Sequence, residues 1–103
     1  MILKSLYDVL MDRKINPREE SYTSYLLYHK KGINKILEKI SEETTEVILA
    51  VKDCKRDEII KEIADLLYHV LVLLVKLDIK LDEIWYELER RRKESLRGMD
   101  SKS

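Results

Sequence analysis

The sequence predicts an all-α fold of about five helices, in which a central antiparallel helix hairpin forms a bundle with a second subunit. The chain of 103 residues has two glycines and one proline, so few residues interrupt helices. Its apolar residues recur at the three- and four-residue spacing of amphipathic helices. This length suits one domain, expected at residues 1–97, and we expect the polar residues 98–103 to be disordered.

The first expected helix covers residues 2–14 and ends before Pro17, because the residue preceding a proline avoids the helical conformation. A short helix over residues 22–29 follows. Ser21 can cap its first turn, and Gly32 is expected to terminate it.

A long helix with an apolar stripe follows from residue 33 and ends around residues 52–55. Asp57 is expected to cap the next helix, over residues 58–77, so the two helices form a tight hairpin. Residues 66–75 are apolar on almost every side of that helix. Such a helix must be buried all round, and a monomer this small has little material to bury it. We therefore expect a homodimer, or a higher oligomer.

The last expected helix is capped by Asp82 and ends near Arg92. Trp85 and Tyr86 are expected to pack it against the rest of the molecule. The basic run that ends it reads best as a solvated group that complements the helix dipole.

Composition argues against several classes of partner. Lysine plus arginine equals aspartate plus glutamate at 20 each, which gives no general attraction for nucleic acid or anionic membrane. The apolar stretch 64–75 is too short to cross a bilayer, and no signal peptide opens the chain. The single cysteine, Cys54, has no partner for an internal disulfide, which fits a reducing compartment. We expect a cytoplasmic protein with neither a nucleic-acid nor a membrane partner.

Four carboxylates are spaced to share one face of the hairpin. Glu43 and Glu46 are three residues apart on one helix, and Glu62 and Asp65 are three apart on the next. Glu46 and Glu62 each lie eight residues from position 54, and Glu43 and Asp65 each lie eleven away. Because packed helix axes lie about 8–10 Å apart, the four side chains can converge on a small volume.

Converging carboxylates repel one another, and a hard divalent cation relieves that repulsion. A site made only of oxygen ligands favours Mg²⁺, with Mn²⁺ as the alternative, and Mg²⁺ commonly bridges carboxylates to substrate phosphates. These residues therefore predict metal-assisted hydrolysis of a phosphate-bearing substrate. The competing interpretation is a solvated acidic face. Asp65 argues against it, because an acid next to an apolar run needs a partner.

The acidic pattern resembles a known signature. Glu42-Glu43-x-x-Glu46 followed by Glu62-x-x-Asp65 is similar to the metal-binding residues of the all-α, MazG-like nucleoside triphosphate pyrophosphatases. Two further segments resemble the phosphoribosyl-ATP pyrophosphatase family within that group, namely Ser21-Tyr22-Thr23 and the segment Ala64-Asp65-Leu66-x-Tyr68-His69-x-Leu71-Val72-Leu73-Leu74. The sequence departs from the family pattern at Ser41, where a glycine is common, and in the hairpin turn at 53–57.

This resemblance implies hydrolysis of 1-(5-phosphoribosyl)-ATP to 1-(5-phosphoribosyl)-AMP and pyrophosphate, a step of histidine biosynthesis, by a Mg²⁺-binding dimer. Its ligands would be Glu43, Glu46, Glu62 and Asp65. One alternative is a housekeeping (d)NTP pyrophosphatase acting through the same ligands. A second is a non-enzymatic helical dimerisation module whose acids are surface charge.

Several other residues are candidates for contact with the substrate. Lys39 lies one helical turn before Glu43 and is expected to meet the phosphates, as is Lys35 a turn earlier; the alternative for Lys39 is an i,i+4 ion pair with Glu43. Glu42 is a candidate for activating the attacking water or else a surface acid.

Three more candidates come from the segments that carry the family resemblance. Tyr22 and Thr23 either shape the nucleotide pocket or cap and pack the short helix. His69 either orients Asp65, touches substrate or is a hydrogen-bonded core residue, the last being favoured slightly.

Overall fold

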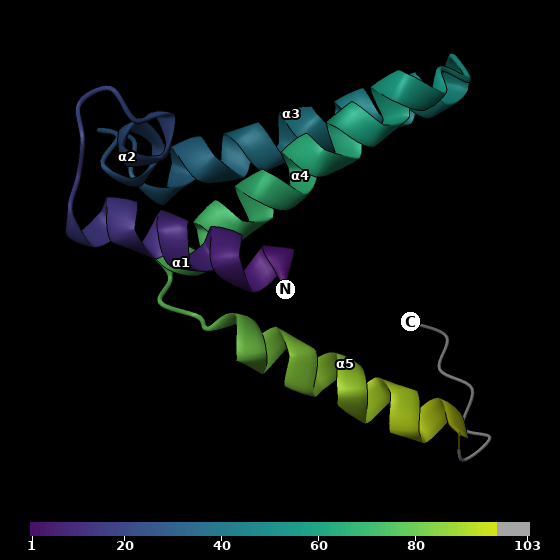
Figure 1. Cartoon of the computed structure of the whole chain (residues 1–103). Helices are drawn as coiled ribbons and strands as arrows, with labels where there is room; N and C mark the ends of the chain where they lie inside the picture. Colours follow the sequence, from purple (N-terminus) through teal and green to yellow (C-terminus); the bar gives the residue numbers. More distant parts are fainter. Residues whose placement is uncertain (97–103) are drawn as a thin grey trace.

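The computed structural model describes residues 1–96, and within this range it contains five α-helices and no β-strand (Figure 1). The helices are α1 (Ile2–Ile15), α2 (Tyr22–Leu27), α3 (Ile33–Lys52), α4 (Arg56–Lys76) and α5 (Leu81–Leu96). The predicted all-α class is confirmed. The second subunit of the bundle stays a prediction, and the expected disordered tail, 98–103, lies outside the described residues.

Helix α2 begins as its sequence predicts, because the Ser21 side chain accepts a hydrogen bond from the Ser24 backbone N–H at 3.1 Å. It ends at Leu27, two residues early, where the Lys76 ammonium donates to the Leu27 carbonyl at 2.7 Å. Gly32 serves as the N-cap of α3, with φ of +62°, and does not terminate α2. The left-handed backbone that glycine tolerates is thus used to enter the next helix.

Two predicted caps are wrong. Helix α4 begins at Arg56 with Lys55 as its N-cap, which places Asp57 in the first turn. Helix α5 begins at Leu81, which likewise places Asp82 in the first turn. In both positions the carboxylate interacts favourably with the partial positive charge of the helix N-terminus, so an acid is favoured there without capping.

The antiparallel pair α3 and α4 is the centre of the fold, and the two helices pack side by side (Figure 1). The turn between them closes without a glycine because Cys54 adopts φ of +55°. A left-handed residue other than glycine costs about 1–2 kcal/mol, so the packing of the two helices must offset this cost.

The core lies at the end of the hairpin far from this turn, where α1 and α2 pack on α4 (Figure 1). Its buried members are Tyr7, Leu10, Leu26, Leu27, Ile36, Leu71, Val72, Leu74, Val75 and Leu81. The Tyr7 hydroxyl donates to the Ile79 carbonyl at 2.9 Å, and the Lys14 ammonium donates to the Val75 carbonyl at 3.0 Å. These bonds tie α1 to the C-terminal end of α4.

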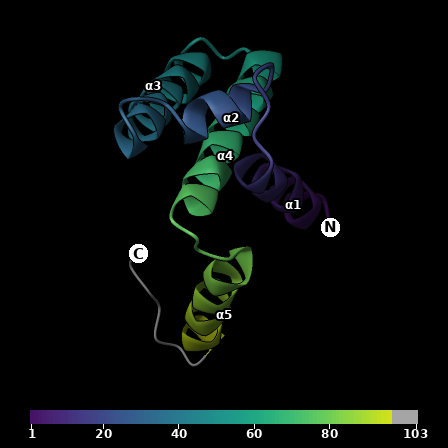
Figure 2. The same cartoon turned by 90° about the vertical axis from the view of Figure 1, so that its left-hand side faces the viewer.

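Helix α5 projects away from the other four helices (Figure 2). Trp85 packs against the core, as expected, but Tyr86 is 75% exposed, so its predicted packing is wrong within the part of the chain described. The basic run at residues 90–92 is solvated and forms ion pairs with glutamates of the same helix.

The apolar second half of α4 is not buried all round within one chain. Its buried residues include His69 and Val72, whereas Leu67 is 48% exposed. Ile63, which precedes the apolar segment by one turn, is 42% exposed. None of the helices within residues 1–96 combines the length and the apolar character that a membrane crossing requires.

We expect Leu26→Ala to lower the free energy of unfolding by about 2–5 kcal/mol, because Leu26 has no exposed surface and its truncation leaves a cavity. Ile2→Ala, at a position 77% exposed, should change it by less than about 0.5 kcal/mol. Urea unfolding of both variants measures the difference. Equal losses would contradict the described core.

Candidate metal centre

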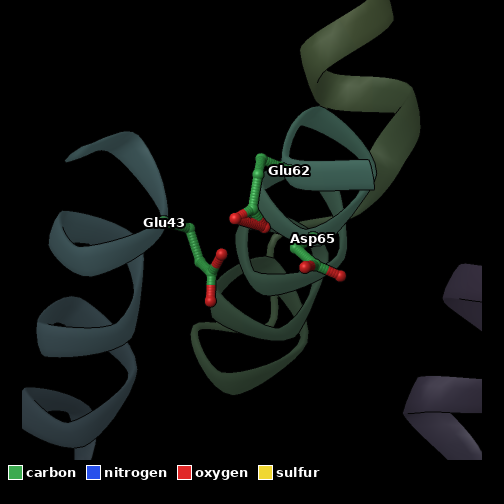
Figure 3. A group of neighbouring side chains, drawn as sticks. All are labelled: Glu43, Glu62 and Asp65. Atoms are coloured by element: carbon green, nitrogen blue, oxygen red, sulfur yellow. The ribbon is translucent and has the colours of Figure 1, made fainter. Parts of the chain in front are cut away.

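Three of the four predicted carboxylates converge between α3 and α4. One carboxylate oxygen each of Glu43, Glu62 and Asp65 lies within 4.8 Å of the other two. Glu43 reaches across from α3, and the other two side chains come from successive turns of α4 (Figure 3). All three are half-buried. Glu43 therefore lies opposite Glu62 and Asp65, as their distances from position 54 predict for two antiparallel helices joined by a short turn.

Glu46 lies outside this group. It is exposed on α3, one helical turn nearer the hairpin turn, and shares a shallow surface depression with Glu62 and Glu58. Its charge still reaches the group, since it contributes to the shifted pKa of Glu62.

The surroundings of Glu62 disfavour its charged form. The pKa of Glu62 is raised above its ordinary value, first by burial, then by a hydrogen bond with Asp65, and further by the charges of Glu43 and Glu46; Lys61 opposes the shift. Removing the repulsion requires a proton or a cation. Half-buried carboxylate oxygens without nitrogen or sulfur ligands fit a hard divalent ion such as Mg²⁺ or Mn²⁺.

Cationic side chains line α3 beside the carboxylates. The Lys39 ammonium lies 2.9 Å from the Glu42 carboxylate, so the two residues form an i,i+3 ion pair. The sequence offers a different pair, between Lys39 and Glu43, as the alternative to phosphate contact. The bond to Glu42 is the first cause of a raised Lys39 pKa. Lys35 lies 3.7 Å from Glu38. Both lysines are half-buried and carry ion pairs that a stronger anion can replace.

Helix α2 is attached to α4 by two side-chain hydrogen bonds. The Tyr22 hydroxyl lies 3.2 Å from His69 Nε2, and Thr23 Oγ1 lies 2.5 Å from the Tyr68 hydroxyl. His69 is 5% exposed, and its Nδ1 lies 2.7 Å from the backbone carbonyl of Asp65. His69 is therefore a hydrogen-bonded core residue, and it also contacts the backbone of a predicted ligand.

Tyr68 was not predicted as a site residue. Its hydrogen bond to Thr23 holds α2 in place, and burial raises its pKa while the Thr23 bond lowers it. The available signal was its position three residues after Asp65, on the same face of α4.

With carboxylates facing each other across a helix hairpin, the chain is an all-α protein with a candidate divalent-metal centre. Comparison with known families makes this specific. The family model described as phosphoribosyl-ATP pyrophosphohydrolase matches residues 3–92, and the chain belongs to this family.

Three curated relatives illustrate the match. The phosphoribosyl-ATP pyrophosphatase of Methanococcoides burtonii is 59% identical over 91 residues, covering 88% of this chain and 92% of that protein. That of Methanocella arvoryzae is 52% identical over 92 residues, covering 89% and 97%. A histidine biosynthesis bifunctional protein of Caldanaerobacter subterraneus is 54% identical over 92 residues, which cover 89% of this chain and 44% of that protein.

Without divalent metal, Glu62→Gln is expected to raise the melting temperature by a few degrees, because it removes a charge that Glu43 and Glu46 repel. The matched variant Glu58→Gln should give no gain, since Glu58 lies in the first turn of α4, where a negative charge is favourable. Thermal unfolding in chelator checks both. A loss of stability in Glu62→Gln equal to that in Glu58→Gln would contradict the repulsive cluster.

Proposed function

We propose that the chain hydrolyses 1-(5-phosphoribosyl)-ATP to 1-(5-phosphoribosyl)-AMP and pyrophosphate, the second step of histidine biosynthesis. The observation that carries this proposal is the family match over residues 3–92, which includes all the converging carboxylates. Relatives at 50–59% identity bear the name phosphoribosyl-ATP pyrophosphatase. We also propose that the reaction takes place in the cytoplasm, a location that the single cysteine favours.

Glu43, Glu62 and Asp65 would hold Mg²⁺, or Mn²⁺. We include Glu46 as a fourth ligand because it lines the same surface depression as Glu62. When bound, the ion would polarise a phosphate oxygen and position a water molecule. The half-buried setting strengthens the interaction of these carboxylates with a cation, because fewer water molecules screen it.

The cationic residues of α3 would bind the phosphates. Lys39 and Lys35 precede Glu43 by one and two helical turns, so they lie in line along the same side of α3. A triphosphate carries more charge than a single carboxylate, so it would draw Lys39 away from Glu42. Glu42, released, would accept the proton of the attacking water as the anhydride between the α- and β-phosphates breaks.

We also propose that the protein is a homodimer. Ile60, Ile63 and Leu67 are 56%, 42% and 48% exposed, and their spacing makes a continuous apolar stripe along α4. The stripe leads into an apolar groove between α4 and α5 that contains Val70 and Ile84. A second copy that presents the same stripe would bury both surfaces, as twofold symmetry requires.

Pyrophosphate release from phosphoribosyl-ATP, with and without Mg²⁺, tests the activity. We expect release to require the metal, and Glu43→Gln to lower kcat/KM by a factor on the order of 100 or more through loss of a ligand. Glu58→Gln, which removes an exposed charge outside the group, should retain activity. Preference for dUTP, dCTP or another ordinary nucleoside triphosphate would contradict the assigned substrate.

Sedimentation velocity tests the dimer. A Leu67→Asp substitution places a charge in the centre of the apolar stripe and is expected to yield monomers, because burial of an unpaired carboxylate is costly. Ile15→Asp, at a position 69% exposed on α1, should leave the dimer intact. A wild-type protein that sediments as a monomer, or a dimeric Leu67→Asp variant, would exclude this interface.

A further inference from the structure

The hydrogen bonds around His69 determine what the Tyr22 hydroxyl can recognise. His69 Nδ1 faces the Asp65 backbone carbonyl, which only accepts hydrogen bonds, so Nδ1 carries the proton. In the neutral ring Nε2 then offers a lone pair, and the Tyr22 hydroxyl must donate to it. With its single proton committed, the phenolic oxygen of Tyr22 presents only lone pairs to any other partner.

This oxygen is connected to a proposed ligand by two hydrogen bonds, one to His69 Nε2 at 3.2 Å and one from His69 Nδ1 to the Asp65 backbone carbonyl at 2.7 Å. Tyr22 is 46% exposed, although its ring contacts those of Tyr68 and His69. Burial raises the pKa of Tyr22, the nearby charge of Lys39 lowers it, and Glu43 raises it. The Tyr22 side chain is therefore partly exposed, and the charges of the proposed phosphate-binding lysine and of a proposed metal ligand both act on it.

We propose that His69 is a positioning residue that makes Tyr22 a hydrogen-bond acceptor, and that Tyr22 recognises a hydroxyl of the ATP ribose, not a phosphate. Phosphate oxygens carry no proton to donate, so an acceptor-only hydroxyl does not bind them. The ATP ribose carries the triphosphate directly, and its hydroxyls are donors that match this oxygen. The assignment rests on the proposed function, because it presupposes a nucleotide held by the carboxylates and Lys39.

Substrate analogues test the assignment directly. Phosphoribosyl-ATP is compared with its 2′-deoxy and 3′-deoxy forms, in which one hydroxyl of the ATP ribose is missing. For the wild-type protein we expect one of these analogues to be used about 10-fold less efficiently in kcat/KM, the value of one hydrogen bond. Tyr22→Phe should lose about the same factor on the intact substrate and none on that analogue, so the preference for the hydroxyl disappears.

Tyr25→Phe is the matched control. Tyr25 lies one turn further along α2, is 50% exposed, and stacks on Tyr22 at 6.0 Å between ring centroids. This variant removes a neighbouring hydroxyl and should keep the full ribose preference. Equal use of all three substrates by the wild-type protein, or an unchanged preference in Tyr22→Phe, would overturn the assignment.

Variants of His69 separate positioning from folding. In His69→Gln the side-chain amide reaches the place of Nε2 and can accept from Tyr22, whereas in His69→Asn it reaches only the place of Nδ1 and keeps the bond to the Asp65 carbonyl. We expect the ribose preference to be retained in the Gln variant and lost in the Asn variant. A ribose preference retained in a folded Asn variant would refute the role of His69. If the Asn variant does not fold, loss of the preference in His69→Gln would refute that role, and Tyr22→Phe still tests the ribose contact.

A separate outcome identifies failure of the proposed function. If the wild-type protein releases no pyrophosphate from intact phosphoribosyl-ATP, the assigned reaction is wrong and the ribose contact falls with it. If it hydrolyses that substrate but shows no ribose preference that depends on Tyr22, the reaction stands and only this inference fails.

Discussion

The packing of α3 against α4 holds together side chains that repel one another. Glu43, Glu62 and Asp65 are half-buried, with one oxygen of each within 4.8 Å of the others, and as three anions they repel one another unless a proton or a cation is bound. The apolar contacts of the hairpin and the core at its far end supply the stabilisation. The site therefore depends on a core to which its own residues do not belong.

Polar contacts join the core to the site. Thr23 and Tyr22 attach α2 to α4 through Tyr68 and His69, and His69 in turn binds the backbone of Asp65. Each buried polar group of this network has a partner, as burial demands; in the described residues no buried side-chain donor or acceptor is left unpaired. The same bonds that satisfy the core also fix the orientation of the Tyr22 hydroxyl.

Much of this arrangement follows from the sequence, because it depends on local periodicity. The spacing of apolar residues predicts all five helices, and equal distances from position 54 predict that Glu43 meets the acids of α4. The details that escape prediction depend on tertiary contacts or rotamers. Examples are the end of α2 at Leu27, whose carbonyl accepts from Lys76, the position of Glu46 outside the group, and the pairing of Lys39 with Glu42. The direction of α5 is set by a short connection whose sequence carries no such periodicity.

The central claim is that the carboxylates between α3 and α4 bind one class of ligand, a hard divalent cation. Titration of Mn²⁺ into the protein, followed by the electron paramagnetic resonance signal of the free ion, measures this binding without any substrate. The account predicts saturable binding that Mg²⁺ displaces and that Asp65→Asn weakens by a factor on the order of 10 or more. Binding of equal strength in wild type and Asp65→Asn, or no binding at millimolar Mn²⁺, would contradict it.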